Sequence, residues 1–230
     1  MKKAIILVLG VVLCAAVGLW VAGYAKTAIQ KREYYSFKAD LPKEVNALVA
    51  AMSDADGKML NDRIVASIAQ MSKIETDYAA AKAANAAPEA LTVLVQAYAD
   101  AITASSSAAK ELSAKAKPSM DTIQGTLRSM ATNSPDQMQA DQQDIGKILQ
   151  PAIVALQPSR DAARAAAPVT MRLLMALSAH QQAGEALTAD LVKQEVLKAC
   201  QAALDDRAEE LNAKPTQLQT QPQTQPQTQP

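Results

Sequence analysis

The sequence predicts an all-α protein: a single N-terminal transmembrane helix, an elongated antiparallel helical bundle with a coiled-coil-like hairpin, and a disordered C-terminal tail. Three observations lead to this class. An apolar run opens the chain, alanine makes up roughly a fifth of its 230 residues, and the enrichment in β-branched and aromatic residues that is typical of strands is missing. We therefore divide the chain into 1–25 (anchor or signal peptide), 26–40 (juxtamembrane connector), 41–214 (bundle domain) and 215–230 (tail).

The run Ala4–Ala25 has the length of a membrane-spanning helix. It contains no charged residue, and its 22 residues would extend about 33 Å, compared with a hydrocarbon core of roughly 30 Å. A signal peptide usually has a shorter apolar stretch, of about 7 to 15 residues. Five of the seven aromatic residues fall between positions 20 and 37, where such a helix would leave the bilayer. We prefer a retained anchor, and cleavage after Ala25, which would release a secreted helical protein, stays the alternative.

The charges around the run leave its orientation open. Lys2 and Lys3 precede it as in export signals, which favours a bundle on the outer, periplasmic side of the inner (cytoplasmic) membrane. The basic residues on the far side of the run favour the opposite orientation by the positive-inside rule: Lys26, Lys31, Arg32 and Lys38. We expect the first arrangement, a single-pass protein for which the lipid bilayer is one partner.

Small residues recur every four positions within the run and form one stripe of a helix: Gly10, Cys14, Gly18 and Ala22. In lipid, small side chains let two helices approach closely enough for van der Waals contact. This stripe is therefore a candidate face for association of two anchors into a homo-dimer. The alternative is that glycine and alanine are common in exported apolar segments without pairing.

Composition excludes several classes of function. The first 39 residues carry a net charge of +5 and the rest a net charge of −5, so the bundle has no basic patch for nucleic acid. Cys14 lies in the apolar run and Cys200 in a distant segment, so we expect no internal disulfide. The fold must then be held by packing alone.

The centre of the bundle should be a helical hairpin. Two runs of apolar and small residues are spaced alternately by four and three positions, as in a heptad repeat. The first is Leu60, Ile64, Ser67, Met71, Ile74, Tyr78 and Ala81, and the second is Leu91, Val95, Tyr98, Ile102, Ser105, Ala109, Leu112 and Ala116. Pro88 between them suits the first turn of a helix. An earlier helix should begin at Leu41-Pro42, and Gly57 should end it or weaken it.

Prolines should divide the rest of the bundle. We expect a break at Lys117-Pro118-Ser119 and a helix start at Ser134, with Gln137 completing a capping box. Pro151 should kink that helix, and Pro158 and Pro168 should divide the next part of the chain. A short helix over 169–183 should pack through Met171, Leu174 and Leu177, and a last helix from about Thr188 to Ala213 through Leu197, Cys200, Leu204 and Leu211.

No motif in the chain predicts catalysis, a cofactor or a metal. The segment Asp54–Gly57 resembles part of a calcium loop, but Met52 and Arg63 occupy two of the ligand positions, so a turn between helices is favoured. His180 is the single histidine, which argues against histidine metal sites and triads. One acidic cluster could hold a divalent ion loosely but is more typical of a solvated helix face: Asp205, Asp206, Glu209 and Glu210. Ser105–Ser107 lacks the glycines of a nucleophile elbow.

We therefore expect a non-enzymatic, membrane-anchored cell-envelope protein whose helical bundle is an interaction or scaffolding domain, with a protein partner or a second copy of itself. No small-molecule substrate is evident. The main alternative is a sensory or small-ligand-binding bundle, which requires a pocket between helices near Tyr78 and Tyr98; we expect both tyrosines to be core residues. The uncharged tail repeats Thr-Gln-Pro every four residues and should be extended, as a spacer or as a docking segment.

Overall fold

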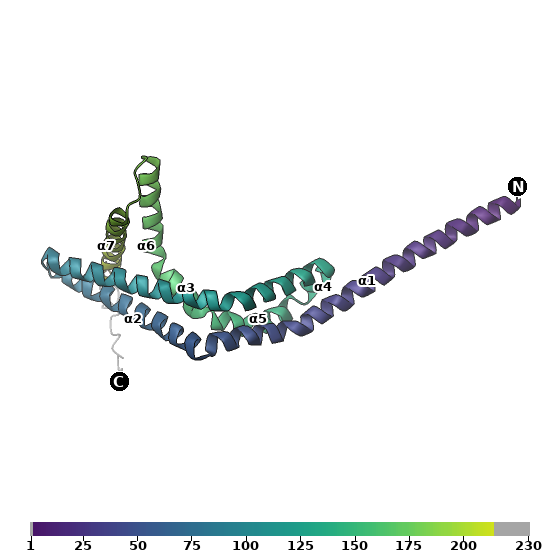
Figure 1. Cartoon of the computed structure of the whole chain (residues 1–230), viewed down its shortest axis with the longest axis horizontal. Coiled ribbons are helices and arrows are strands. Elements are labelled where there is room, and N and C mark those ends of the chain that lie inside the picture. Colours follow the sequence, from purple (N-terminus) through teal and green to yellow (C-terminus); the bar gives the residue numbers. More distant parts are fainter. Residues whose placement is uncertain (1, 214–230) are drawn as a thin grey trace, which may run out of the picture. The chain divides into compact units, whose positions relative to one another are not determined.

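Figure 1 shows a computed structural model of the protein, which describes the backbone of residues 2–213 and the side chains of residues 28–213. The secondary structure of this part of the chain is entirely α-helical, which confirms the all-α class. Its seven helices are α1 (Lys2–Ser53), α2 (Ala55–Ala83), α3 (Pro88–Asn133), α4 (Pro135–Ala140), α5 (Gln142–Ala155), α6 (Gln157–Gln182) and α7 (Ala189–Ala213).

The chain divides into two compact units, each of which combines segments that are distant in the sequence. Unit 1 comprises Met1–Gly57 and Ala114–Leu156, and unit 2 comprises Lys58–Ser113 and Gln157–Pro230. Helix α3 gives its first part to unit 2 and its last part to unit 1. The segment limits that we predicted from the sequence, including 41–214 for the bundle domain, stay predictions.

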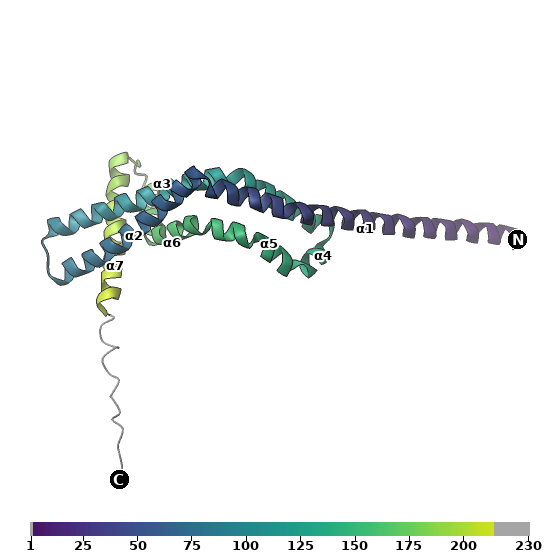
Figure 2. The same cartoon turned by 90° about the horizontal axis from the view of Figure 1, so that it is seen from below.

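In unit 1, α1, α5 and the last part of α3 lie side by side (Figures 1 and 2). Helix α3 runs antiparallel to α1, because Lys115 forms an ion pair with Asp54 (2.6 Å) and the Thr126 hydroxyl donates to Glu44 (2.8 Å). The apolar core repeats at helical spacing on the three helices: Tyr34, Leu41, Val45, Leu48, Met52, Ala116, Ile123, Met130, Ile145 and Ala152. Val45, Leu48 and Met52, which recur at helical spacing after Leu41-Pro42, are thus core residues of unit 1.

We predicted that a helix begins at Leu41-Pro42, and this prediction is wrong. Helix α1 runs without a break from Lys2 to Ser53, so the connector 26–40 is part of this helix. A proline inside a helix removes one backbone donor and costs about 3 kcal/mol. Leu41 and Val45 are both buried on the face beside Pro42, and we attribute the continuity of the helix to this packing.

The aromatic residues near the start of the described side chains fit the predicted membrane interface only in part. Tyr34 is fully buried, and its hydroxyl donates to Asp141 (3.1 Å), so this residue belongs to the core of unit 1. Its neighbour Tyr35 is exposed. Within residues 28–213, no helical segment is long and apolar enough to cross a membrane. The side chains of the predicted anchor, 1–25, lie outside this range.

Unit 2 contains the predicted helical hairpin. Helices α2 and α3 are antiparallel, since Arg63 pairs with Glu111 (3.7 Å) and Tyr98 donates to Glu75 (3.1 Å). Pro88 is the first residue of α3, as predicted. Most residues of the two heptad runs are buried: Leu60, Ile64, Ser67, Met71, Ile74, Tyr78, Val95, Tyr98, Ser105 and Leu112 in unit 2, and Ala116 in unit 1. Helix α7 adds Cys200 and Leu204 to the same core, and its predicted packing residues are confirmed there.

Two of the predicted breaks are absent. Pro118 lies inside α3 and Pro168 inside α6, and both helices continue through them. In each case small or apolar side chains on both sides of the proline are buried, such as Ala116 and Ile123 around Pro118, and we attribute the continuity of both helices to this burial. Figure 1 shows that α6 changes direction along its length, and prolines are a usual cause of such a kink.

The helix start at Ser134 is confirmed, with Pro135 as the first residue of α4, but the predicted capping box is wrong. The Ser134 side chain makes no capping hydrogen bond. The Gln137 side-chain amide donates to Asp141 (3.2 Å) instead of reaching back to the start of the helix. The Asp141 carboxylate also accepts hydrogen bonds from Tyr34 and Lys38, so three side chains of this junction donate to it. The predicted tail, 215–230, lies outside the described residues.

Candidate functional site

Helix α6 has two rows of residues at heptad spacing, which we call seams. One seam is buried in unit 2, and the other is exposed to solvent. The buried seam comprises Ala162, Ala166 and Val169, continued by the half-buried Leu173. The second seam follows the same four-three-four spacing but is exposed: Ala167, Met171, Leu174 and Ser178. Met171 and Leu174 are each 56 % exposed, and the adjacent Met175 is 64 % exposed. We call these five residues the exposed α6 seam.

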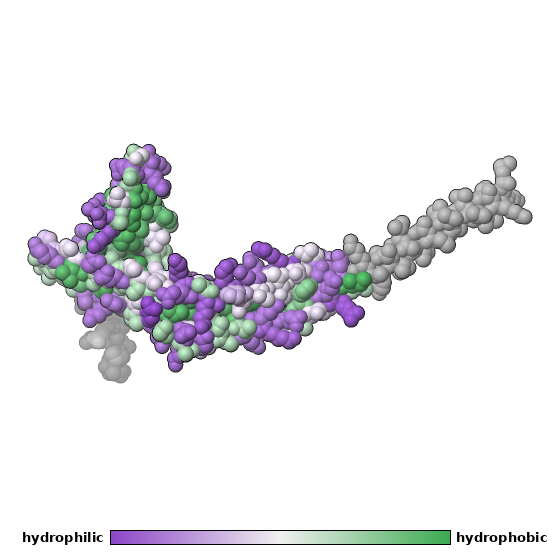
Figure 3. Space-filling model, viewed as in Figure 1, coloured by the Kyte–Doolittle hydropathy of each residue, from purple (hydrophilic) through white to green (hydrophobic). Residues whose placement is uncertain are grey.

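The exposed α6 seam forms an apolar patch on the surface of unit 2, seen as the green area on α6 in Figure 3. None of its five side chains is ionisable. Single exposed apolar residues need no explanation, but a contiguous patch of large ones is typical of an interaction site. Our prediction that Met171 and Leu174 pack inside the bundle is therefore wrong, since both face solvent.

The position of α6 is fixed by its contacts with α7. The two helices pack together, and Arg172 forms an ion pair with Asp206 on α7. The end of α6 is closed by Gly184, whose φ of +74° favours glycine, and by a hydrogen bond from the Glu185 amide to the His180 carbonyl (3.0 Å). Thr188 then caps α7 by accepting from the Leu191 amide (3.2 Å). The exposed α6 seam thus lies on a helix whose C-terminal end is closed by these contacts.

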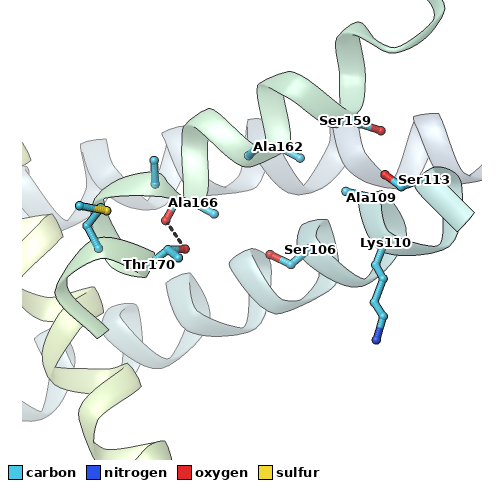
Figure 4. A pocket seen from close by; sticks show the side chains of 11 residues that line it. Ser106, Ala109, Lys110, Ser113, Ser159, Ala162, Ala166 and Thr170 are labelled. Carbon is cyan, nitrogen blue, oxygen red and sulfur yellow. Dashed lines mark hydrogen bonds between the residues drawn. The ribbon is translucent and has the colours of Figure 1, made fainter. Parts of the chain in front are cut away.

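A hollow of about 450 Å³ adjoins the seam between α3 and α6 (Figure 4). Its walls are mostly small side chains, including Ala109, Ala162 and Ala166, and Met171 belongs to both the hollow and the seam. The Ser159 hydroxyl lines it and has no hydrogen-bond partner among the described residues. Small walls permit close approach by another chain, but they offer few groups that could orient a small ligand.

Tyr78 and Tyr98 are core residues, as we expected, and each is tied to an acid at the edge of the core. Burial, helped by a hydrogen bond to Asp205 (2.9 Å), raises the pKa of Tyr78 to about 12. Burial, together with the negative charge of Glu75, likewise raises the pKa of Tyr98. Both phenols therefore stay protonated at neutral pH and act as hydrogen-bond donors.

A second hollow, of about 360 Å³, opens beside Tyr98 and is charged on its walls. Three guanidinium groups and three carboxylates line it: Arg164, Arg172, Arg207, Glu75, Asp206 and Glu210. Arg207 pairs with Glu75 (3.3 Å) and Glu210 (2.6 Å), so most of these charges already satisfy one another. The hollow lies next to Tyr98 but not next to Tyr78, so it meets only part of the requirement for a pocket near both tyrosines.

His180 is half-buried at the end of α6 between two carboxylates. Its Nδ1 lies 2.6 Å from Glu185 and its Nε2 lies 3.5 Å from Glu195, a buried acid that also pairs with Lys198 (2.7 Å). The hydrogen bond to Glu185 is the main reason that the pKa of His180 is raised. These contacts of the imidazole link the end of α6 to α7.

The predicted acidic cluster on α7 is neutralised by cations instead of being free for an ion. Asp205 accepts from Lys82 (2.6 Å), while Asp206 and Glu210 pair with arginines of α6 and α7. Glu209 is exposed beside them. Within residues 28–213, no group of three histidine, cysteine or acidic side chains is arranged to hold a metal ion.

The segment Asp54–Gly57 forms a turn between helices, the interpretation that we favoured over a calcium loop. Asp54 separates α1 from α2, and its side chain accepts a hydrogen bond from the Gly57 amide (2.8 Å), as a helix cap does. Lys115 pairs with the same carboxylate and, with these hydrogen bonds, lowers the pKa of Asp54. Gly57 lies in the first turn of α2, so it does not end the preceding helix.

Three nucleophilic side chains of the described part of the chain, Ser105, Ser107 and Cys200, are each buried or already hydrogen-bonded. Ser105 is fully buried, and Ser107 donates to Glu111 (3.2 Å) without a histidine nearby. Cys200 is also fully buried, and burial raises the pKa of its thiol to about 11, which disfavours the reactive thiolate. The predicted association face Gly10, Cys14, Gly18 and Ala22 lies outside the described side chains.

Sequence reasoning missed the exposed α6 seam because it treated Pro168 as the end of a helix. Once 157–182 is one helix, the two interleaved four-three-four patterns are visible in the sequence itself. Comparison with known proteins adds no assignment: the chain matches no family model, and neither curated proteins nor solved structures give a match.

Proposed function

We propose that the chain is a non-enzymatic, membrane-anchored protein of the cell envelope whose helical bundle binds another protein chain through the exposed α6 seam. One observation carries this proposal: helix α6 presents three large apolar side chains to solvent, at the spacing by which helices pair. We favour a non-enzymatic role because, within residues 28–213, Ser105 and Cys200 are buried and Ser107 is hydrogen-bonded to Glu111 and not to a histidine.

The proposed location rests on the apolar run. Helix α1 begins at Lys2, so the 22 residues from Ala4 to Ala25 belong to a helix whose length would match the bilayer. We place the protein in the inner (cytoplasmic) membrane as a single-pass protein, with the helical domain that follows the anchor on the outer, periplasmic side. The stripe from Gly10 to Ala22 would let two anchors associate, and the tail 215–230 would act as an extended spacer.

Cell fractionation tests the location. The full chain, tagged after Pro230, is expected in the membrane fraction, resistant to alkaline carbonate and with a mass that includes Met1–Ala25. A protease added to the outside of spheroplasts should degrade the bundle. A chain that begins at Lys26 and appears in the soluble fraction would contradict the anchor, and protection from the protease would reverse the orientation.

A second candidate function is a ligand-binding bundle, and the charged hollow beside Tyr98 favours it. Arg164 lies on its wall with its nearest acid, Asp161, 3.9 Å away, so it is the least engaged of the three guanidinium groups there. A small zwitterion would fit such mixed walls. Calorimetric titration of the full chain with mixed amino acids tests this candidate, with Arg164→Ala as the matched variant.

A further inference from the structure

We propose that the occupant of the exposed α6 seam is a second copy of this chain, paired α6 against α6 in an antiparallel, two-fold arrangement. This inference rests on the proposed function and names its partner. Three properties of the seam support it: its spacing, the sizes of its residues and its lack of charge.

The spacing identifies the occupant as a helix. A seam in which contacts alternate every four and three residues repeats along one side of a helix and meets an equivalent seam on a neighbour. In α6 the buried seam through Ala162, Ala166 and Val169 already meets helices of unit 2. The exposed α6 seam is displaced from it around the same helix, and its large side chains remain more than half exposed among the described residues.

The sizes of the residues fit a copy of the same seam. Read in order, the four heptad positions are small, large, large and small: Ala167, Met171, Leu174 and Ser178. A two-fold axis between Met171 and Leu174 sets Met171 of each copy against the partner's Leu174. The same axis sets Ala167 against the partner's Ser178. The pairs of large side chains therefore lie at the centre of the interface, and the pairs of small side chains lie at its ends. Such self-complementarity is what a two-fold interface requires.

Charge does not oppose this pairing. The seam contains no ionisable side chain, and the nearest guanidinium on the helix, Arg172, is held by Asp206 on α7. Residues 40–230 carry a net charge of −5, but none of this charge lies on the five side chains of the exposed α6 seam. An uncharged face gives no electrostatic selection of a basic or acidic partner, and two copies of it meet without bringing like charges together.

The area of the exposed α6 seam determines how tightly we expect two copies to bind. Standard stable interfaces bury about 800 Å² on each partner, and three half-exposed side chains supply only part of this. The dimer should therefore be weak for a chain free in solution. Two chains held in one membrane have a high effective concentration, which favours pairing without any new contact.

The experiment places a photo-crosslinking amino acid at Met175 of the full chain in cells that also express a differently tagged second copy. We expect an adduct of twice the chain mass that contains both tags. An adduct with a different protein would overturn the second-copy inference and leave the proposed interaction function standing. No adduct at all would contradict both. Leu174→Lys should reduce the dimer adduct by at least about tenfold, whereas Val93→Lys, at a 68 % exposed position on α3, should not.

The orientation is tested in a Cys14→Ala background with a short bis-maleimide in membranes. Chains with Met171→Cys mixed with chains with Leu174→Cys should cross-link to each other more than either cross-links to itself, because position 171 faces 174 across the axis. A parallel pair would instead cross-link each variant to itself, and this result would overturn the antiparallel arrangement. Cys200 is fully buried and does not interfere with the readout.

Discussion

The backbone of Met52 leaves no space for a side chain at Gly57. A Cβ atom built on Gly57 would lie 2.5 Å from the Met52 carbonyl oxygen, at the junction where α1 ends and α2 begins. Gly57→Ala should therefore force the junction apart and lower the free energy of unfolding by at least about 1 kcal/mol. Urea denaturation followed by circular dichroism measures this change.

Gly125 supplies the matched control, because it lies inside α3 with nothing within 4 Å of an added Cβ. Gly125→Ala should stabilise unit 1 by roughly 0.5 to 1 kcal/mol, the ordinary gain from replacing glycine in a helix. Equal effects of the two substitutions would show that the junction tolerates a side chain, contrary to the geometry.

The hydrogen bond from Tyr78 to Asp205 should contribute to the stability of unit 2. Tyr78→Phe keeps the ring in the core but removes the donor from a carboxylate that then has Lys82 alone. We expect a loss of about 1 to 2 kcal/mol in the free energy of unfolding. Tyr35→Phe is the control, since that ring is exposed and the change should be within about 0.5 kcal/mol.

The helices of the hairpin could be predicted from the sequence because the heptad spacing continues over many residues there and no proline within either heptad run predicts a break. From Leu60 to Ala116 every predicted core position depends only on neighbours three or four residues away. Where two signals compete, prediction fails. At Pro42, Pro118 and Pro168 the local rule favours a break, and the burial of adjacent side chains, which depends on segments far away in the chain, outweighs it.

The same competition explains what was missed at the candidate site. Met171 and Leu174 are apolar at helical spacing, and such residues usually face a core. Whether they do so depends on which side of α6 meets α7, and the buried seam through Ala166 and Val169 decides this. Composition alone does not distinguish two seams on one helix, because the small residues of the buried seam are less conspicuous than the large ones of the exposed seam.

His180 should make the stability of the α6–α7 connection depend on pH. Its pKa is raised in the folded chain, chiefly by the hydrogen bond to Glu185, so the protonated form stabilises the fold. This stabilisation is fully present below the unfolded value of about 6.5 and is lost as pH rises through the raised folded pKa. Wild type should exceed Glu185→Gln in melting temperature at pH 6, and the difference should shrink by pH 9.

The histidine signal in an NMR titration gives the folded pKa directly, because the chain contains one histidine. The other charged groups that face His180 are Glu195 and, through it, Lys198. A His180 pKa at or below 6.5 in the wild type would contradict the assigned contact. A pH-independent difference between the two variants would mean that Glu185 acts through something other than this imidazole.

Cys200 should be unreactive in the folded chain. In a Cys14→Ala variant it is the single thiol, and burial both covers it and raises its pKa to about 11. We expect its reaction with a water-soluble disulfide reagent at pH 8 to be at least about 100-fold slower than in urea, because the thiol reacts only when the core opens. Rapid, complete labelling of the native chain would contradict the packing of α7.

Substitutions of two leucines of unit 2 distinguish a core position from a position on the candidate interaction surface. Leu204 is 1 % exposed in the core of α7, so Leu204→Ala should lower the free energy of unfolding by about 2 to 5 kcal/mol. Leu174→Ala should change the same free energy by less than about 0.5 kcal/mol, because the side chain already faces solvent. Both are measured by urea denaturation at a chain concentration low enough to keep the protein monomeric. A large loss for Leu174→Ala under these conditions would mean that its side chain packs within its own chain, and the exposed α6 seam would then not be an interaction surface.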